Sequence, residues 1–239
     1  MKTHFAILFK SLFLGTITPL VISCTHGQTT ERLLPYIDTR MGTAASITHT
    51  AGMFGKHTEE YGQTLPAVLE PNGMNFWTPQ TQDTEQKCIA PYYYRDSLFQ
   101  GFRNSHWITG GCTQDYGSMT LSALFDSLRC IPEKRGTRFA HEQETATPSY
   151  YSVTLPEEHL QAEMTGRSRS AIFRFTYQKA GKAYLIVNPN SDEGEGYIEI
   201  DTLRKRIYGY NPVQPHLLRL GEPADISGHF NGGLSKGTL

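Results

Sequence analysis

Short stretches in which apolar and polar residues alternate constrain the fold of this chain most. Residues 171–177, AIFRFTY, place an aromatic side chain at every second position, and residues 151–155 and 160–164 alternate in the same way. This period of two predicts strands with one buried face. Residues 183–187, AYLIV, are apolar throughout, which predicts a strand that is buried on both faces.

Turn-forming residues separate these stretches by about ten residues, which is the spacing of strands in a β-sandwich. They are Pro156, Gly166, Gly181, Asn188-Pro189 and Gly209. Few windows beyond the first 24 residues repeat apolar residues with the period of a helix. We therefore predict an all-β fold, an antiparallel β-sandwich whose sheets pack face to face and are connected by long, functional loops.

The first 24 residues predict export. Two lysines precede and interrupt an apolar stretch from Ile7 to Ile22 that contains no acidic residue. This stretch is short for a membrane span and is broken by glycine and proline, so a secretory signal peptide fits it better. It ends in VISC, which resembles a bacterial lipobox with Cys24 as the lipidated residue. Lipidation would anchor the exported protein to a bacterial membrane, in the periplasm or at the cell surface; ordinary cleavage nearby, with Cys24 incidental, is the alternative.

Charge and cysteine usage argue against two kinds of site. The chain has 22 basic and 23 acidic residues, and the two lysines lost with the signal peptide leave 20 basic residues. This balance predicts a typical soluble surface without a basic patch for nucleic acid. The remaining cysteines, Cys88, Cys112 and Cys130, form no CxxC pair, so we expect no structural zinc site.

Residues 101–121, GFRNSHWITGGCTQDYGSMTL, combine aromatic, imidazole and carboxylate side chains between glycines. Glycines allow tight turns and a close approach of the backbone to a ligand. Flat rings beside polar groups suit a polyhydroxylated ligand, since rings stack on C–H faces and polar groups bind hydroxyls. His106, Trp107, Asp115 and Tyr116 are therefore candidate substrate-binding residues. Ordinary packing within a β-sandwich is the alternative.

This segment and residues 61–81, YGQTLPAVLEPNGMNFWTPQT, together resemble the N-terminal domain of glycoside hydrolase family 92, the calcium-dependent exo-α-mannosidases. The resemblance covers roughly residues 35–213 and begins with YIDTRMGT at 36–43. Other residues that carry it are His57-Thr58, Gly62, Pro66, Ala67, Pro71, Gly73, Met74, Pro79, Thr81, Cys88 and Tyr92–Tyr94. The family usually has Pro-Gly-Ala where this chain has Leu65-Pro66-Ala67, which indicates a subgroup.

The resemblance implies a supersandwich-like domain that forms part of the sugar-binding wall of an exported, inverting exo-α-mannosidase acting on mannose-containing glycans. In the family, the catalytic acid, the catalytic base and most calcium ligands belong to a C-terminal helical barrel, which this sequence does not include. We therefore expect this chain to carry no catalytic residue and no metal site, and to be inactive without that partner domain. The alternative is a lipid-anchored β-sandwich that binds glycans without cleaving them.

Two further candidate substrate-binding residues, Glu85 and Cys88, bear on linkage specificity. Family members that cleave α-1,2 linkages tend to carry tryptophan three positions before the cysteine equivalent to Cys88, and Glu85 occupies that position here. The missing indole argues against α-1,2 specificity and leaves α-1,3, α-1,4 and α-1,6 linkages open. A carboxylate also disfavours a phosphorylated mannoside, because like charges repel.

The end of the chain departs from the family. Residues 214–220, QPHLLRL, lose the expected aromatic character, whereas GEPA at 221–224 and SGHF at 227–230 resemble the family again. A shifted reading frame or an interrupted gene explains this pattern, and genuine divergence in a short protein is the alternative. We predict a signal peptide over 1–23, a linker over 24–34, the family 92 domain over 35–213 and a divergent or frame-shifted tail over 214–239.

We predict that Cys24 carries acyl chains, because VISC has the form of a lipobox. Mass spectrometry of the membrane fraction should find a modified N-terminus at Cys24, and Cys24→Ala should release the protein from the membrane. An unmodified N-terminus at another residue, or a Cys24→Ala variant that stays attached, would contradict the prediction.

Overall fold

The computed structural model describes residues 36–54, 62–83, 89–107, 115, 118–190, 196–211 and 224–229. Within them the chain is mostly β, with antiparallel strands and almost no helix, which confirms the predicted fold class at that level. The strands are β1 (Phe76–Gln80), β2 (Leu98–Phe99), β3 (Gly101–Ser105), β4 (Met119–Phe125), β5 (Thr137–Arg138), β6 (Glu144–Thr147), β7 (Tyr150–Leu155), β8 (Leu160–Gly166), β9 (Ala171–Tyr177), β10 (Ala183–Asn188), β11 (Tyr197–Asp201), β12 (Arg206–Asn211) and β13 (Ala224–His229). The helical segments are α1 (His49–Phe54), α2 (Pro132–Arg135), η3 (His141–Gln143) and η4 (Pro156–Glu158).

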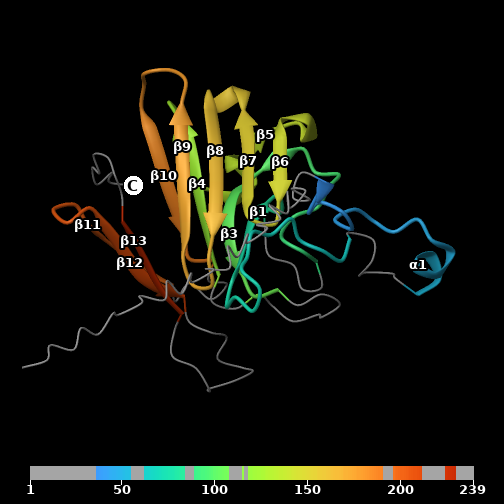
Figure 1. The fold of residues 1–239 in the computed structure, drawn as a ribbon. Helices are drawn as coiled ribbons and strands as arrows, with labels where there is room; N and C mark the ends of the chain where they lie inside the picture. The colour runs from blue at the N-terminus through green and yellow to red at the C-terminus, as the bar shows by residue number, and fades with distance from the viewer. Residues whose placement is uncertain are drawn as a thin grey trace, which may run out of the picture. The chain divides into compact units, whose positions relative to one another are not determined.

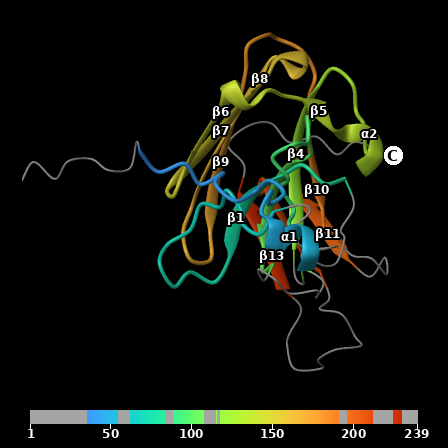
Figure 2. The same cartoon turned by 90° about the vertical axis from the view of Figure 1, so that its right-hand side faces the viewer.

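Two four-stranded sheets form the main body of the fold (Figure 1). Sheet I has the strand order β1-β3-β4-β10 and sheet II the order β6-β7-β8-β9. Strands β2 and β5 form a short ribbon, and β11, β12 and β13 form a third sheet. Figure 2 shows strands of sheets I and II as two separate layers. All strand pairs are antiparallel, as the alternating pattern predicts.

The core lies between sheets I and II and is centred on Phe102 of β3, which is 1% exposed. Its ring meets Tyr151 of β7 edge to face at a centroid distance of 6.0 Å and stacks on Phe173 of β9 at 5.5 Å. Small and branched residues fill the space around these rings, among them Val153 and Ala162. Burying one large apolar side chain contributes about 1.5–3 kcal/mol, so aromatic contacts across the layers hold the two sheets together.

Burial along β9 follows the sequence pattern, since every second residue faces the core and the others are exposed. The prediction for residues 183–187 is wrong in one respect. They form part of β10 as expected, but none of its residues is buried. β10 lies at the edge of sheet I and pairs only with β4, so a continuous apolar run here marks an edge strand and not a central one.

The face of sheet I that points away from sheet II is polar and nevertheless buried. The register places Thr78 of β1 and Thr120 of β4 beside Arg103 of β3, and these three residues are at most 2% exposed. Within this layer the Thr120 hydroxyl donates to Oε1 of Gln80 at 2.6 Å. A polar face is buried at low cost only when its groups are hydrogen-bonded. On this face Arg103 binds Asp115 and Ser118, and Asn190 donates to the Thr120 hydroxyl.

The predicted signal peptide over 1–23 and the linker over 24–34 lie outside the described residues, and the domain boundaries remain predictions. Part of the predicted tail over 214–239 forms β13, which pairs with β12 from Arg206↔His229 to Asn211↔Ala224. In the described part of the chain, no helix has the length and apolar character needed to cross a membrane.

Candidate functional site

Three segments that carry the family resemblance meet at one place. The backbone N–H of Gln63 donates to the carbonyl of Gly42 at 2.9 Å, and the N–H of Tyr94 donates to the carbonyl of Thr43 at 3.0 Å. Residues 36–43 are therefore fixed between the segments that begin at residue 62 and end at residue 94. We call this place the motif junction.

Gly62 is required at the motif junction for two reasons. Its φ of +81° lies in the left-handed region that side chains rarely adopt. A Cβ at this position would also come within 2.5 Å of the backbone carbon of Thr43 and 2.7 Å of the carbonyl oxygen of Gly42. The glycine thus permits the close approach of two chain segments, which explains why this residue belongs to the motif.

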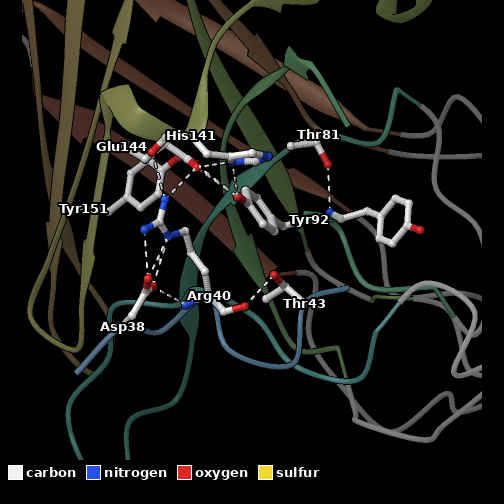
Figure 3. A network of polar contacts seen from close by, with 9 residues as sticks. Asp38, Arg40, Thr43, Thr81, Tyr92, His141, Glu144 and Tyr151 are labelled. Carbon is white, nitrogen blue, oxygen red and sulfur yellow. Dashed lines mark hydrogen bonds and ion pairs between the residues drawn. The ribbon is translucent and has the colours of Figure 1, made fainter. Parts of the chain in front are cut away.

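A buried carboxylate, Glu144, lies beneath the motif junction and binds four side chains (Figure 3). The hydroxyl of Tyr92 donates to its two oxygens at 3.2 and 3.1 Å, and the hydroxyl of Tyr151 donates to Oε1. Nδ1 of His141 lies 2.6 Å from Oε2, and Nη1 of Arg40 lies 3.4 Å from the same oxygen. The Glu144 side chain is completely excluded from solvent, so these partners replace its hydration.

Arg40 connects this carboxylate to the N-terminal segment. Its guanidinium binds both carboxylate oxygens of Asp38, with the shortest contact at 2.8 Å, and its Nη1 donates to the carbonyl of His141 at 2.9 Å. The hydrogen bond from Arg40 lowers the pKa of Asp38. Burial raises the pKa of Tyr92, and the neighbouring Glu144 carboxylate raises it further, so its phenol stays protonated and remains a donor. The network therefore clamps residues 36–43 onto sheet II.

Sequence reasoning missed this network as a unit. Asp38 and Arg40 lie in the motif YIDTRMGT, and Tyr92 lies in the run Tyr92–Tyr94. Three members of the network therefore belong to segments that carry the family resemblance. Glu144 and His141 lie in a stretch without any motif. Only the fold brings them to Arg40, more than 100 positions away in the sequence.

Asp115 is buried and paired. Its Oδ2 accepts from Nε of Arg103 at 3.0 Å and from the Ser105 hydroxyl at 2.7 Å, and its Oδ1 accepts from the backbone N–H of His106 at 2.7 Å. Asp115 is 6% exposed and Arg103 is 2% exposed. The carboxylate therefore ties the end of the 107–115 segment back to β3.

The other described candidates lie directly after β3. Trp107 is only 4% exposed. Its backbone N–H donates to the Ser105 hydroxyl at 3.1 Å, while its indole Nε1 has no hydrogen-bond partner within the described structure. His106 is half-buried. Glu85, Cys88 and Tyr116 lie outside the described residues, and the role of all six candidates in sugar binding remains a prediction.

The strand register separates the starts of the two predicted loops. Gln80 of β1 pairs with Gly101 and Phe76 pairs with Ser105, so β1 ends where β3 begins. Thr81 and His106 therefore follow opposite ends of this strand pair.

Asp96 is the carboxyl group with a raised pKa in this region. It is half-buried, and Oδ2 accepts from the Thr81 hydroxyl at 2.6 Å and from Nε2 of Gln82 at 2.8 Å. Burial raises the pKa of Asp96, the Thr81 hydrogen bond partly opposes this, and the charge of Asp83 raises it further. Perturbed carboxyl groups are common at functional sites, and this one flanks the segment that contains Glu85 and Cys88.

The described residues do not fit calcium, which the family resemblance implies for the whole enzyme. Calcium needs six to eight oxygen ligands, mostly carboxylates and carbonyls. The described part of the chain contains no group of three His, Cys, Asp or Glu residues that could hold a metal ion. Glu144 is occupied by phenols, His141 and Arg40, and Asp115 is occupied by Arg103.

Comparison with known proteins places these segments in a family context. A profile described as the glycosyl hydrolase family 92 N-terminal domain matches residues 36–238. Among solved structures, the chain is similar to a family GH92 inverting mannosidase from Bacteroides thetaiotaomicron, with 31% sequence identity and a TM-score of 0.63 over 75% of this chain and 22% of that one. A family GH92 α-mannosidase from the same organism shares 23% identity, with a TM-score of 0.57 over 74% of this chain and 23% of that one, and supports the fold alone. No curated protein matches the chain. The chain thus spans about a fifth of the length of these solved mannosidases.

We predict that Asp115→Ala lowers the free energy of unfolding by about 3–5 kcal/mol, because it leaves Arg103 buried without its charge partner. Glu157→Ala is the matched control, since Glu157 pairs with Arg138 at 3.9 Å on the exposed surface. This control should cost less than about 1 kcal/mol. Urea unfolding of both variants measures the two losses of unfolding free energy. Equal losses would show that the buried Arg103–Asp115 pair contributes no more stability than the exposed pair.

We predict opposite pH dependences for the stability contributed by Asp96 and Asp38. The pKa of Asp96 is raised in the folded state, so the folded protein retains a proton that the unfolded chain releases near pH 3.8. Relative to Asp96→Asn, the wild type should therefore lose stability as pH rises from that value to the raised pKa. The pKa of Asp38 is lowered, so relative to Asp38→Asn the wild type should gain stability as pH rises towards 3.8. Thermal melting over this pH range checks both signs, and parallel curves for the two variants would contradict them.

Proposed function

Because the chain belongs to the glycosyl hydrolase family 92 N-terminal domain family, we propose that it forms part of the sugar-binding wall of an exported α-mannosidase. The similarity to an inverting mannosidase, at 31% identity over 75% of the chain, carries this proposal. The reaction is hydrolysis of terminal α-mannosides of glycans with inversion. That reaction needs one carboxylic acid and one carboxylate about 6.5–9.5 Å apart. We assign both groups, and calcium, to a C-terminal domain.

We assign the sugar contact in this chain to His106. Of the three described candidates at the end of β3, Trp107 and Asp115 are buried, whereas His106 is only half-buried. Asp115 accepts the His106 backbone N–H at 2.7 Å and is itself held by Arg103. An imidazole on a backbone fixed in this way is preorganised to hydrogen-bond a sugar hydroxyl, which lowers the entropy cost of binding.

Export and membrane attachment through Cys24 form part of the same proposal. They rest on the apolar stretch up to Ile22 and on the lipobox-like VISC. An enzyme anchored in this way would act on glycans outside the cytoplasm, in the periplasm or at the cell surface.

We predict that this chain alone does not release the aryl group from an activated aryl α-mannoside, with or without calcium. Positioned acid and base groups each contribute on the order of 10²–10⁴-fold to the rate, and the proposal places both elsewhere. Fusion of this chain to the C-terminal portion of the similar inverting mannosidase should restore calcium-dependent release. Activity of the chain alone above a heat-killed control would show that the catalytic groups lie in this chain.

The same hybrid tests His106. His106→Ala should lower kcat/KM roughly tenfold, since a lost hydrogen bond of this kind is worth about 1.5 kcal/mol, and should lower the melting temperature less than Asp115→Ala does. Thr176→Ala, on the exposed face of sheet II, is the matched control and should change neither quantity. A His106→Ala hybrid with full activity would remove His106 from the sugar site.

A further inference from the structure

One face of the third sheet carries a cluster of tyrosines around a carboxylate. The register of β11 and β12 pairs Tyr197 with Tyr210 and Glu199 with Tyr208, so all four side chains lie on the same face. The rings of Tyr197 and Tyr210 stack at a centroid distance of 5.6 Å and an interplanar angle of 25°. We call these four residues the tyrosine face.

The tyrosine face is accessible, while two residues on the opposite face of β12 are buried. Tyr197, Tyr208 and Tyr210 are 45%, 41% and 40% exposed. On the other face, Ile207 is 5% exposed and Asn211 is 4% exposed, and Nδ2 of Asn211 donates to the carbonyl of Ser118 at 2.8 Å. Ile200 of β11 lies on that opposite face as well and is 39% exposed.

Hydrogen bonds hold two of these rings in place. The hydroxyl of Tyr197 donates to Oε2 of Glu199 at 2.7 Å, and the hydroxyl of Tyr208 donates to Oε1. These bonds raise the pKa of both phenols, so both stay neutral. Because each hydroxyl gives its proton to Glu199, its oxygen is left as a hydrogen-bond acceptor towards solvent. The face thus combines flat apolar rings with acceptors fixed at their edges.

We propose that the tyrosine face is a second glycan-binding site, separate from the sugar-binding wall, and that it takes a neutral polyhydroxylated sugar of a mannose-rich glycan. The C–H face of a pyranose packs on aromatic rings, and its hydroxyls donate to the phenol oxygens. The Glu199 carboxylate disfavours anionic glycans by charge repulsion. The sugar class follows from this chemistry, whereas the choice of mannose rests on the proposed function.

The test is a titration of the intact chain with a neutral α-linked mannotriose. Binding is measured from the amide chemical shifts and by calorimetry. The expected result is saturable shifts in residues 197–211. Tyr208→Ala should weaken binding by about three- to tenfold, because it removes a ring contact and an acceptor. Tyr208→Phe, which keeps the ring, should weaken it less. Mannose 6-phosphate should bind more weakly than mannose.

Tyr150→Phe is the matched control, because the Tyr150 hydroxyl also donates to a carboxylate, Oε1 of Glu163, at 2.6 Å on sheet II. It should bind the mannotriose as the wild type does. Unshifted amides in residues 197–211, or equal affinities of the wild type and a folded Tyr208→Ala variant, would overturn the proposal. The mannosidase proposal fails separately, since an inactive hybrid would refute it while glycan binding at the tyrosine face could still be measured on this chain.

Discussion

The buried carboxylate of Glu144 is the interaction on which the arrangement of the motif segments depends. A fully buried carboxylate is tolerated only when several donors replace water, and Tyr92, Tyr151, His141 and Arg40 do so here. Removing any one donor leaves the buried Glu144 carboxylate with fewer hydrogen bonds in place of water, so the network acts as a unit. Through it, one acidic residue of β6 fixes a loop tyrosine and the N-terminal segment to the same sheet.

The second constraint is the polar but buried face of sheet I. A simple sandwich has one apolar inner face and one solvated outer face on each sheet. Here the outer face carries Thr78, Arg103 and Thr120, which are at most 2% exposed. Asp115 binds Arg103 on this face and also binds the backbone N–H of His106, so the residues that follow β3 are held against the polar face. Their positions depend on the Arg103–Asp115 pair as much as on the loop itself.

Local patterns predicted those features that depend on neighbouring residues. Alternation was sufficient to predict burial along β9, because burial of every second side chain needs only one packed face. The ordered motifs were sufficient to identify the family. Burial of Asp115 could not be predicted in the same way. Arg103 and Ser105 share one face of β3 by alternation, but only the path of the chain after β3 returns Asp115 to them. An apolar run such as that of β10 does not reveal whether a strand lies inside a sheet or at its edge.

The long sequence separation between Arg40 and Glu144 has a consequence for the order of folding. Arg40 and Glu144 are 104 positions apart, so residues 36–43 leave the ribosome long before their partners exist. Contacts of this kind form late, because the chain between them must be ordered first. Until η3 and β6 have been made, Arg40 has neither the His141 carbonyl nor the Glu144 carboxylate to bind. The N-terminal motif is thus synthesised early in the domain and fixed late, in the period when a folding chain is most open to a chaperone or a protease.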